Sequence, residues 1–186
     1  MLDWKQIWDR KGSSEETNLI CLNGYEKTDI NPSQVAESIS EFLDLDENTA
    51  VLEVGCGAGM IAQYLSCKYT GVDYSESLIK KHEELVGNKP ILAAADNLPF
   101  DDNMFDCVFA FSIFQYFPDI EYTNRAIDEM HRVCKGGGKI FIGDLPIKSH
   151  SKDHMLYQIG DMQKRGFSTG NGFYNPDRFN IWKVKK

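Results

Sequence analysis

Three glycines at alternate positions, Gly55, Gly57 and Gly59, follow the apolar run of residues 49–54, and an acid, Glu53, comes two residues before the first of them. Glycine adopts backbone angles that other residues avoid, so Gly55 suits a sharp turn at the end of a strand. Gly57 and Gly59 would leave no side chain between the backbone and a ligand. A tight strand-to-helix turn without a ligand is the alternative, but three glycines at this spacing favour a ligand-binding loop.

The next predicted strand, residues 69–73, ends in an acid, Asp73. A carboxylate at this place can accept hydrogen bonds from both hydroxyls of a ribose. The dinucleotide fingerprint G-x-G-x-x-G/A fits less well, because the third glycine comes one residue early and Met60 takes the last position. The sequence therefore predicts a nucleoside ligand rather than a pyrophosphate. A nicotinamide-dependent oxidoreductase is an alternative that fits the fold but not Met60.

Acids and aromatic residues also follow the third and fourth predicted strands, residues 90–96 and 105–112. Asp96 could accept a hydrogen bond from an adenine amino group, and Leu98 with its neighbouring backbone could contact the ring. Three aromatic residues come after the fourth strand: Phe114, Tyr116 and Phe117. Acids beside aromatic rings suit a cationic ligand better than a phosphate.

Four residues are candidates for handling a second substrate: Gln115 after the fourth strand, Asp144 after the fifth, and the pair His150 and His154. Asp144 could orient or deprotonate a hydroxyl. Histidines four residues apart share a face if their segment is helical, and one of them could be a general base. A metal-binding pair is conceivable, but solvated surface histidines are favoured because no nearby acid completes a metal motif.

The segment 1–30 is expected to be either a lid or part of the core. Trp4 and Trp8 are spaced to form the apolar face of a helix, which favours core packing. In the lid interpretation, Tyr25 or Lys27 would lie near a carboxylate of the ligand.

The whole chain alternates between predicted strands and helices. Asn31 before Pro32, Ser75, and Asp119 after Pro118 are typical helix starts. A helix is also expected directly after the glycine loop, with Met60, Ile61, Tyr64 and Leu65 on its apolar face. Strands that are apolar on both faces indicate a mostly parallel sheet covered by helices, an α/β Rossmann-like fold.

Residues 145–186 are expected to form a compressed region on the substrate side. It would contain a helix over residues 154–167 and a strand over residues 177–186, at an edge of the sheet because of its lysines. His82 and His131 are expected on charged helix faces, without a special role.

The 186 residues suit one domain, 1–186, and carry a formal net charge of -8. This charge argues against nucleic acid as the main partner. The sequence has no apolar stretch of transmembrane length and no signal peptide at its start, so a cytoplasmic location and no membrane partner are expected. The five cysteines are odd in number and form no CxxC pair, so small buried thiols are favoured over a disulfide framework or a zinc site.

Four segments together resemble the class I S-adenosylmethionine-dependent methyltransferases, close to the branch called methyltransferase type 11. They are "VLEVGCGAG" (51–59), "GVDYS" (71–75), "ADNLPFDDNMFDCVF" (95–109) and "RVCKGGGKIFIGD" (132–144). The resemblance implies a doubly wound sheet in the order 3-2-1-4-5-7-6 with an antiparallel strand 7. It also implies S-adenosylmethionine as cofactor, with Glu53 and the glycines near its methionyl part, Asp73 on the ribose, and Asp96 with Leu98 at the adenine.

The full predicted cofactor-binding set is Glu53, Gly55, Cys56, Gly57, Gly59, Asp73, Tyr74, Asp96, Asn97, Leu98, Phe111 and Tyr25. The chain departs from the family in two respects. The region after the fifth strand, which in the family leads to a fuller final hairpin and can carry a substrate cap, is compressed here. Gln115 stands where many relatives carry His.

The sequence thus predicts methyl transfer to an oxygen or nitrogen atom of a small molecule. Oxygen is preferred because Asp144 and the two histidines could act as bases. A regulatory protein that binds the cofactor without catalysis is the alternative, and the compressed C-terminal region motivates it.

Overall fold

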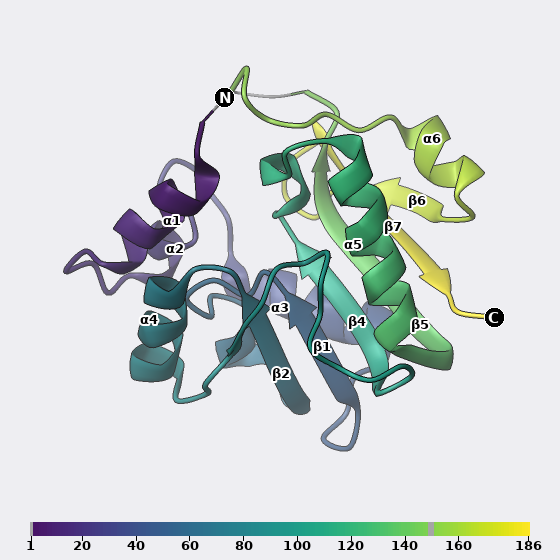
Figure 1. The fold of residues 1–186 in the computed structure, drawn as a ribbon, viewed down its shortest axis with the longest axis horizontal. Helices are drawn as coiled ribbons and strands as arrows, with labels where there is room; N and C mark the ends of the chain where they lie inside the picture. Colours follow the sequence, from purple (N-terminus) through teal and green to yellow (C-terminus); the bar gives the residue numbers. More distant parts are fainter. Residues whose placement is uncertain (1, 149–150) are drawn as a thin grey trace. The chain divides into compact units, whose positions relative to one another are not determined.

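The computed structural model describes residues 2–148 and 151–186. These residues form two compact units divided after Ala94. The described residues contain seven strands in the order β3-β2-β1-β4-β5-β7-β6, as the family resemblance implies (Figure 1). His150 lies outside the described residues.

The first unit contains three parallel strands: β1 (Ala50–Val54), β2 (Lys68–Asp73) and β3 (Ile91–Leu92). β1 is buried almost throughout, and apart from Glu53 its residues are apolar. The prediction of a strand over residues 90–96 is wrong in length. β3 pairs only with β2 at the end of the sheet, and Ile91 and Leu92 are exposed there.

Two helices of this unit begin at the residues that the sequence indicates. α3 (Pro32–Leu43) starts after Asn31, whose side chain accepts a hydrogen bond from the backbone of Gln34, and has proline at its start. α4 (Glu76–Val86) starts after Ser75, whose hydroxyl accepts from the backbone of Leu78. These side chains satisfy N–H groups that have no partner within the helix.

The helix expected directly after the glycine loop is absent, and only a short 3-10 turn, η1 (Ala62–Tyr64), forms there. Gly59 has a φ of 92°, and Leu65 is already extended. Only a few residues separate the loop from the start of β2, which leaves no room for a packed helix. Tyr64, expected to face the core, is accordingly 49% exposed.

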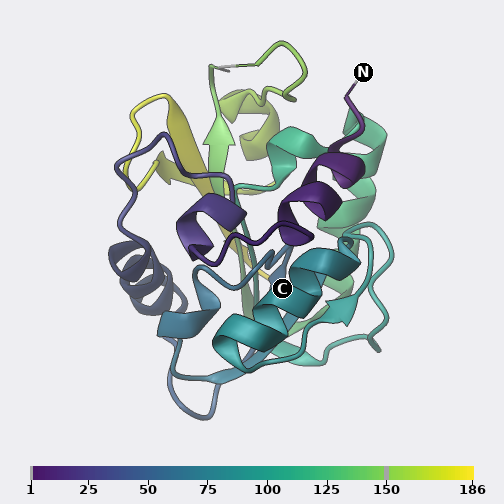
Figure 2. The ribbon, with the colours of Figure 1, turned by 90° about the vertical axis from the view of Figure 1, so that its left-hand side faces the viewer.

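The segment 1–30 packs within its own unit through α1 (Trp4–Gly12) and α2 (Leu19–Leu22). Figure 2 shows α1 beside α4, where Ser75 donates to the Asp9 carboxylate at 2.6 Å and Ser77 donates to the Asp9 carbonyl at 2.8 Å. At Gly12 a Cβ would lie 2.6 Å from the backbone nitrogen of Leu78. The two helices therefore touch backbone to backbone.

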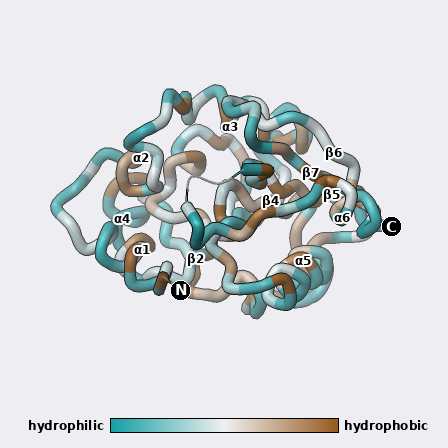
Figure 3. The backbone as a smooth tube through the Cα atoms, turned by 90° about the horizontal axis from the view of Figure 1, so that it is seen from above, coloured by the Kyte–Doolittle hydropathy of each residue, from teal (hydrophilic) through white to brown (hydrophobic). Residues whose placement is uncertain are grey.

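The second unit contains β4 (Phe105–Phe111), β5 (Cys134–Pro146), β6 (Ser168–Asn171) and β7 (Arg178–Val184). β4 and β5 are parallel, whereas β7 is antiparallel to both β5 and β6. The hydrophobic stretches of β4 and β5 are brown in Figure 3, and their central residues are buried. α5 (Ile120–Val133) starts after Asp119, as predicted. It buries Ala126, Ile127, Met130 and Val133 and contacts β4 and β5.

Two expectations for the C-terminal region are wrong. Residues 151–158 are not helical, and α6 covers only Ile159–Lys164, because Gln158 is still extended. β7 is not an edge strand, since β6 pairs along its outer side. The lysines of β7 suggested an edge, but its residues Arg178–Ile181 are buried. A short 3-10 turn, η2 (Phe114–Tyr116), follows β4.

The contact between α1 and α4 gives a first prediction. Gly12→Ala places a methyl group against the backbone of α4, so we expect the free energy of unfolding to fall by about 1–3 kcal/mol and residues 1–30 to become protease-sensitive. Chemical denaturation and limited proteolysis measure both effects. Gly160→Ala is the matched control, because a Cβ there meets no atom within 4 Å. A Gly12→Ala variant as stable and as protease-resistant as the wild type would contradict the backbone contact.

Candidate functional site

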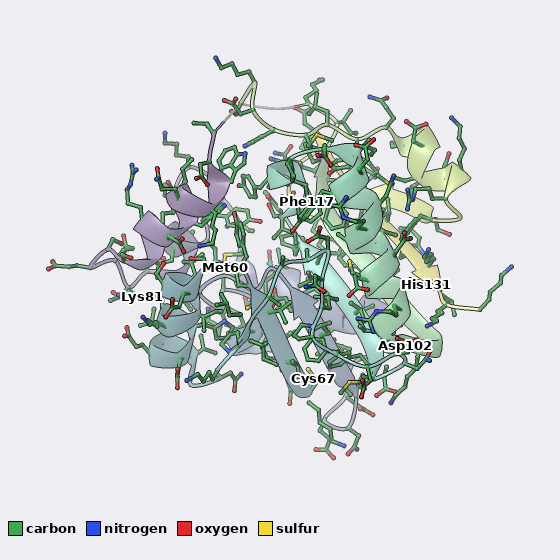
Figure 4. The ribbon with its side chains drawn as sticks, viewed as in Figure 1. Met60, Cys67, Lys81, Asp102, Phe117 and His131 are labelled. Atoms are coloured by element: carbon green, nitrogen blue, oxygen red, sulfur yellow. The ribbon has the colours of Figure 1, made fainter. Side chains whose placement is uncertain are left out.

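The glycine loop turns sharply at the carboxyl end of β1, as the spacing predicts. Gly55, Gly57 and Gly59 have φ values of 77°, 53° and 92°, which are left-handed conformations that favour glycine. The backbone N–H groups of Gly55 and Cys56 both donate to the Val72 carbonyl at 2.8 and 3.0 Å. These bonds tie the loop to β2. Cys56 is buried, as is Met60, labelled beside α4 in Figure 4.

The Asp73 carboxylate lies at the carboxyl end of β2 and is oriented by backbone groups. Gly57 N–H donates to its Oδ2 at 2.8 Å, and Ser75 N–H donates to its Oδ1 at 2.9 Å. Burial raises the pKa of Asp73 to about 6, although the N–H groups of Ser75, Gly57 and Tyr74 act to lower it. Each carboxylate oxygen can accept a further hydrogen bond, so Asp73 is suited to the two hydroxyls of a ribose.

The remaining contacts of the loop differ from the expected ones. His82 of α4 is completely buried rather than on a charged face, and its Nδ1 lies 3.2 Å from the Gly57 carbonyl. A Cβ on Gly59 would lie 2.7 Å from Val86 Cγ2, and one on Gly57 would lie 2.5 Å from Asn23 Nδ2. The close approaches at these two glycines are thus made by the chain's own side chains. A direct role for both in binding the cofactor stays a prediction.

Glu53 is buried in β1 and accepts a hydrogen bond of 2.7 Å from the Tyr69 hydroxyl. Burial raises the pKa of Glu53 to about 8, and the nearby Asp73 adds to the rise. Glu53 is therefore protonated at neutral pH. A Cβ on Gly71 would lie 2.7 Å from the Tyr69 hydroxyl, so this glycine leaves the room in which Tyr69 reaches Glu53.

Tyr25 is 6% exposed and Trp8 9% exposed, so these two aromatic residues of the N-terminal segment contribute to the core, whereas Trp4 is only partly buried. Lys11 fastens the segment by donating to the Cys21 carbonyl at 2.9 Å and to the Glu26 carboxylate at 3.1 Å. Tyr74, beside Asp73, is partly buried, whereas Lys27 is exposed. These contacts support the packing interpretation of residues 1–30.

In the second unit, Asp96 is held by Arg125, whose Nε and Nη2 both donate to Oδ2, at 3.0 and 2.9 Å. Leu98 is buried, and its backbone N–H donates to Glu129 at 2.8 Å. Arg132 donates to the Leu98 carbonyl, which fixes the loop from both sides. Asn97 is exposed. An adenine amino group would have to share Asp96 with Arg125.

Phe111 ends β4 and stacks on Phe173 with ring centroids 6.2 Å apart. Phe173 stacks on Phe141 as well, at 5.7 Å. Gly143 leaves room for this stack, because a Cβ there would lie 2.6 Å from the Phe111 ring. Phe111 is therefore a packing residue within its unit, and its predicted contact with the cofactor stays a prediction.

Gln115 and Asp144 belong to one buried polar cluster beyond Phe111. Ser112 and Asp144 both have positive φ, 57° and 63°, although neither is glycine. The Gln115 amide donates to the Ser112 carbonyl at 2.8 Å and lies 2.9 Å from its hydroxyl. Asp144 sits where the pairing of β5 with β7 shifts register. Such strained positions and bulges are common at functional sites.

Three further residues of this cluster were missed from the sequence. Tyr174 donates to Asp144 Oδ2 at 3.0 Å, Arg178 donates to the Asp144 carbonyl at 3.2 Å, and the Asp144 N–H donates to Asn180 at 3.0 Å. The buried Arg178 and Asn180 alternate along β7, so alternating polar residues in a strand of otherwise apolar character were the available signal. Burial raises the pKa of Asp144, whereas Arg178, Ser112 and Tyr174 lower it.

His154 is separate from any helix. It lies in the non-helical stretch before α6, with its ring 5.4 Å from that of Tyr116. The described residues around His154 form no helix, so the expected helix face that His154 would share with His150 is absent there. Among the described residues no cluster of three potential metal ligands occurs, and no helix has the length and apolarity to cross a membrane.

The high pKa of Glu53 makes stability depend on pH. The ordinary value is 4.5, so between pH about 5 and 8 the folded protein keeps a proton that the unfolded chain releases. The free energy of unfolding should therefore fall as pH rises through this range, and Glu53→Gln should reduce that fall. Asp73 contributes to this fall only up to pH about 6, because its pKa in the folded protein is about 6. Denaturant titrations at pH 6 and 8 measure the fall in the free energy of unfolding for the wild type and Glu53→Gln, with the exposed Glu41→Gln as control. An equal fall in all three proteins would show that Glu53 is already ionised.

Residues 52–142 match a family model described as a methyltransferase domain. Sterol 4-C-methyltransferase strm-1 of Caenorhabditis elegans is 33% identical over 125 residues, which cover 62% of this chain and 36% of that protein. The chain spans less than half the length of the curated relatives it matches.

Two solved structures share the fold. One is an S-adenosyl-L-methionine-dependent methyltransferase of Methanococcus maripaludis, with a TM-score of 0.66, 16% identity, and coverage of 83% of this chain and 84% of that one. The other comes from the complex between the Trm112 methyltransferase activator and a methyltransferase of Haloferax volcanii, with a TM-score of 0.73, 15% identity, and coverage of 95% and 96%. The family match includes the glycine loop, Asp73 and Asp96, and together with the shared fold it confirms the predicted resemblance to the class I S-adenosylmethionine-dependent methyltransferases.

Proposed function

We propose that this protein transfers the methyl group of S-adenosylmethionine to an oxygen or nitrogen atom of a small molecule. One observation carries the choice of acceptor atom. Asp144 Oδ1 and Gln115 Oε1 are buried and have no hydrogen-bond partner among the described residues. Buried polar atoms without partners are rare in folded proteins, so these two favour a ligand that completes them.

Both atoms accept hydrogen bonds. The Gln115 amide nitrogen already donates to the Ser112 carbonyl, so the atom of Gln115 that lacks a partner is its amide oxygen, Oε1. A hydroxyl or an amine can donate to such acceptors, whereas a carbon nucleophile has no strong donor of its own to offer them. The cluster therefore supports an acceptor that carries its own proton.

Asp144 is suited to take that proton. Burial raises its pKa above the ordinary value of 3.8, which makes the carboxylate a stronger base than an exposed one. Tyr174 and Arg178 hold Oδ2 and the backbone, and so leave Oδ1 for the acceptor. The cofactor, when bound, supplies an electrophilic methyl group on a sulfonium, and the protein's contribution is to position the nucleophile and exclude water.

Asp73, Glu53, Tyr74 and the glycine loop are the residues of the first unit that we assign to the cofactor, with Tyr25 as a buried neighbour in the same unit. Asp73 fits a ribose because two N–H groups orient its carboxylate before any ligand arrives. For Asp96, Asn97, Leu98 and Phe111 in the second unit, contact with the adenosine remains part of the proposal. A small molecule is favoured over nucleic acid because the net charge is -8.

Asp73→Ala should weaken binding of S-adenosylhomocysteine about 100-fold, since two hydrogen bonds to a charged group are lost. Because the pKa of Asp73 is about 6, wild-type affinity should also fall between pH 7 and 5, and Asp73→Asn should remove that step. Calorimetric titration measures both, with exposed Asp29→Ala as control. Unchanged affinity of Asp73→Ala would remove Asp73 from the cofactor site.

Asp144→Asn should lower turnover at least about 100-fold, because the general base is lost, while affinity for S-adenosylhomocysteine stays at the wild-type level. The assay follows S-adenosylhomocysteine formation with panels of small hydroxyl, amine and carbon acceptors. Tyr174→Phe, which removes one bond to Asp144, is a milder second variant and should give an intermediate rate. Full turnover in Asp144→Asn, or turnover with carbon acceptors alone, would overturn the proposal.

A further inference from the structure

The side chain of Asn23 covers the glycine loop. Asn23 directly follows α2, and its backbone N–H donates to the Leu19 carbonyl at 3.1 Å. Its amide lies over Gly57, where an added Cβ would be 2.5 Å from Nδ2 and 3.2 Å from Cγ. Only glycine allows this approach, so α2 delivers a polar side chain to the one loop residue whose N–H orients Asp73.

The Asn23 amide makes no hydrogen bond to any described residue, and Oδ1 is buried. A buried amide oxygen without a partner destabilises a fold, and a leucine of nearly the same shape would fill this place without that cost. The side chain is therefore arranged for something other than stability. An unused amide presents one acceptor, Oδ1, and donors on Nδ2.

The two acids near the loop, Glu53 and Asp73, already accept hydrogen bonds from the protein, so the amino-acid end of the cofactor needs another partner. Glu53 accepts the Tyr69 hydroxyl and is protonated at neutral pH, and the two Asp73 oxygens each accept a backbone N–H. The amino-acid end of S-adenosylmethionine carries an ammonium, which needs acceptors, and a carboxylate, which needs donors. Asn23 offers both kinds of atom on one planar group.

We propose that the Asn23 amide binds the amino-acid end of the cofactor, with Oδ1 accepting from the ammonium and Nδ2 donating to the carboxylate. The inference rests on the family's cofactor and is independent of the methyl acceptor proposed above. It gives α2 a role in ligand binding that neither its length nor its sequence suggested.

The test compares two ligands that differ only at this end. S-adenosylhomocysteine carries the amino-acid group, and 5′-methylthioadenosine lacks it. Asn23→Leu keeps the packing over Gly57 but removes both polar atoms. We expect it to bind S-adenosylhomocysteine about tenfold more weakly and 5′-methylthioadenosine as tightly as the wild type, with a thermal unfolding midpoint that is unchanged or higher.

Asn18→Ala is the matched control, because the Asn18 side chain caps the start of the same helix by accepting from the Ile20 N–H at 2.9 Å. It should lower both affinities by one common factor or leave both unchanged. Asn23→Ala, which removes the amide without adding a branched side chain, should reproduce the selective loss. Equal loss of both ligands in Asn23→Leu and Asn23→Ala, or no loss of S-adenosylhomocysteine, would show that Asn23 only packs and would overturn the proposal.

Discussion

The peptide unit of Gly57 is the point on which the first unit's site depends. Its N–H orients Asp73 at the end of β2, its carbonyl meets His82 of α4, and its Cα lies under Asn23. Three elements distant in the sequence thus meet at one residue without a side chain. A φ of 53° and the absence of a Cβ are both needed, so the glycine serves the chain's own packing and the orientation of the carboxylate at once.

The same arrangement places two acids in low-dielectric surroundings. Glu53 and Asp73 are 3% and 6% exposed, and the charge of Asp73 adds to the cost of ionising Glu53. A neutral Glu53 lets Asp73 remain the charged partner at neutral pH, since the pKa values of about 8 and about 6 separate the two groups. Burying acids costs stability, and retaining them here is consistent with selection for a ligand rather than for the most stable fold.

Local signals made much of the fold predictable. Asn31, Ser75 and Asp119 cap helices as expected, because a capping side chain bonds to backbone only a few residues away. The failures concern features set by neighbours: β3 is short because it is the outer strand, and β7 is internal because β6 pairs with it. Asp73 could be proposed from the sequence because it ends a strand at a recognisable spacing from the glycine loop. Asn23 was missed because its contact with Gly57 joins residues far apart along the chain, which no local pattern reports. For Arg178 the alternation with Asn180 along β7 was a signal, but its partner Asp144 is likewise distant in the sequence.

Backbone strain in the second unit is concentrated at Ser112 and Asp144, which follow the last residue pair of β4 and β5. β4 and β5 pair in register up to Phe111 and Gly143, and the next residue of each strand, Ser112 and Asp144, adopts a positive φ. Asp144 stays within β5, which shifts register against β7 at this point and continues to Pro146. Ser112 directly follows β4 and keeps a backbone hydrogen bond of 3.1 Å to the Gly143 carbonyl. At these two positions the Ser112 carbonyl accepts from Gln115 and the Asp144 carboxylate accepts from Tyr174, while one acceptor atom on each of Gln115 and Asp144 stays free. A fold shaped only by stability would have paired or removed those atoms, so the strain is best explained by the ligand that completes them.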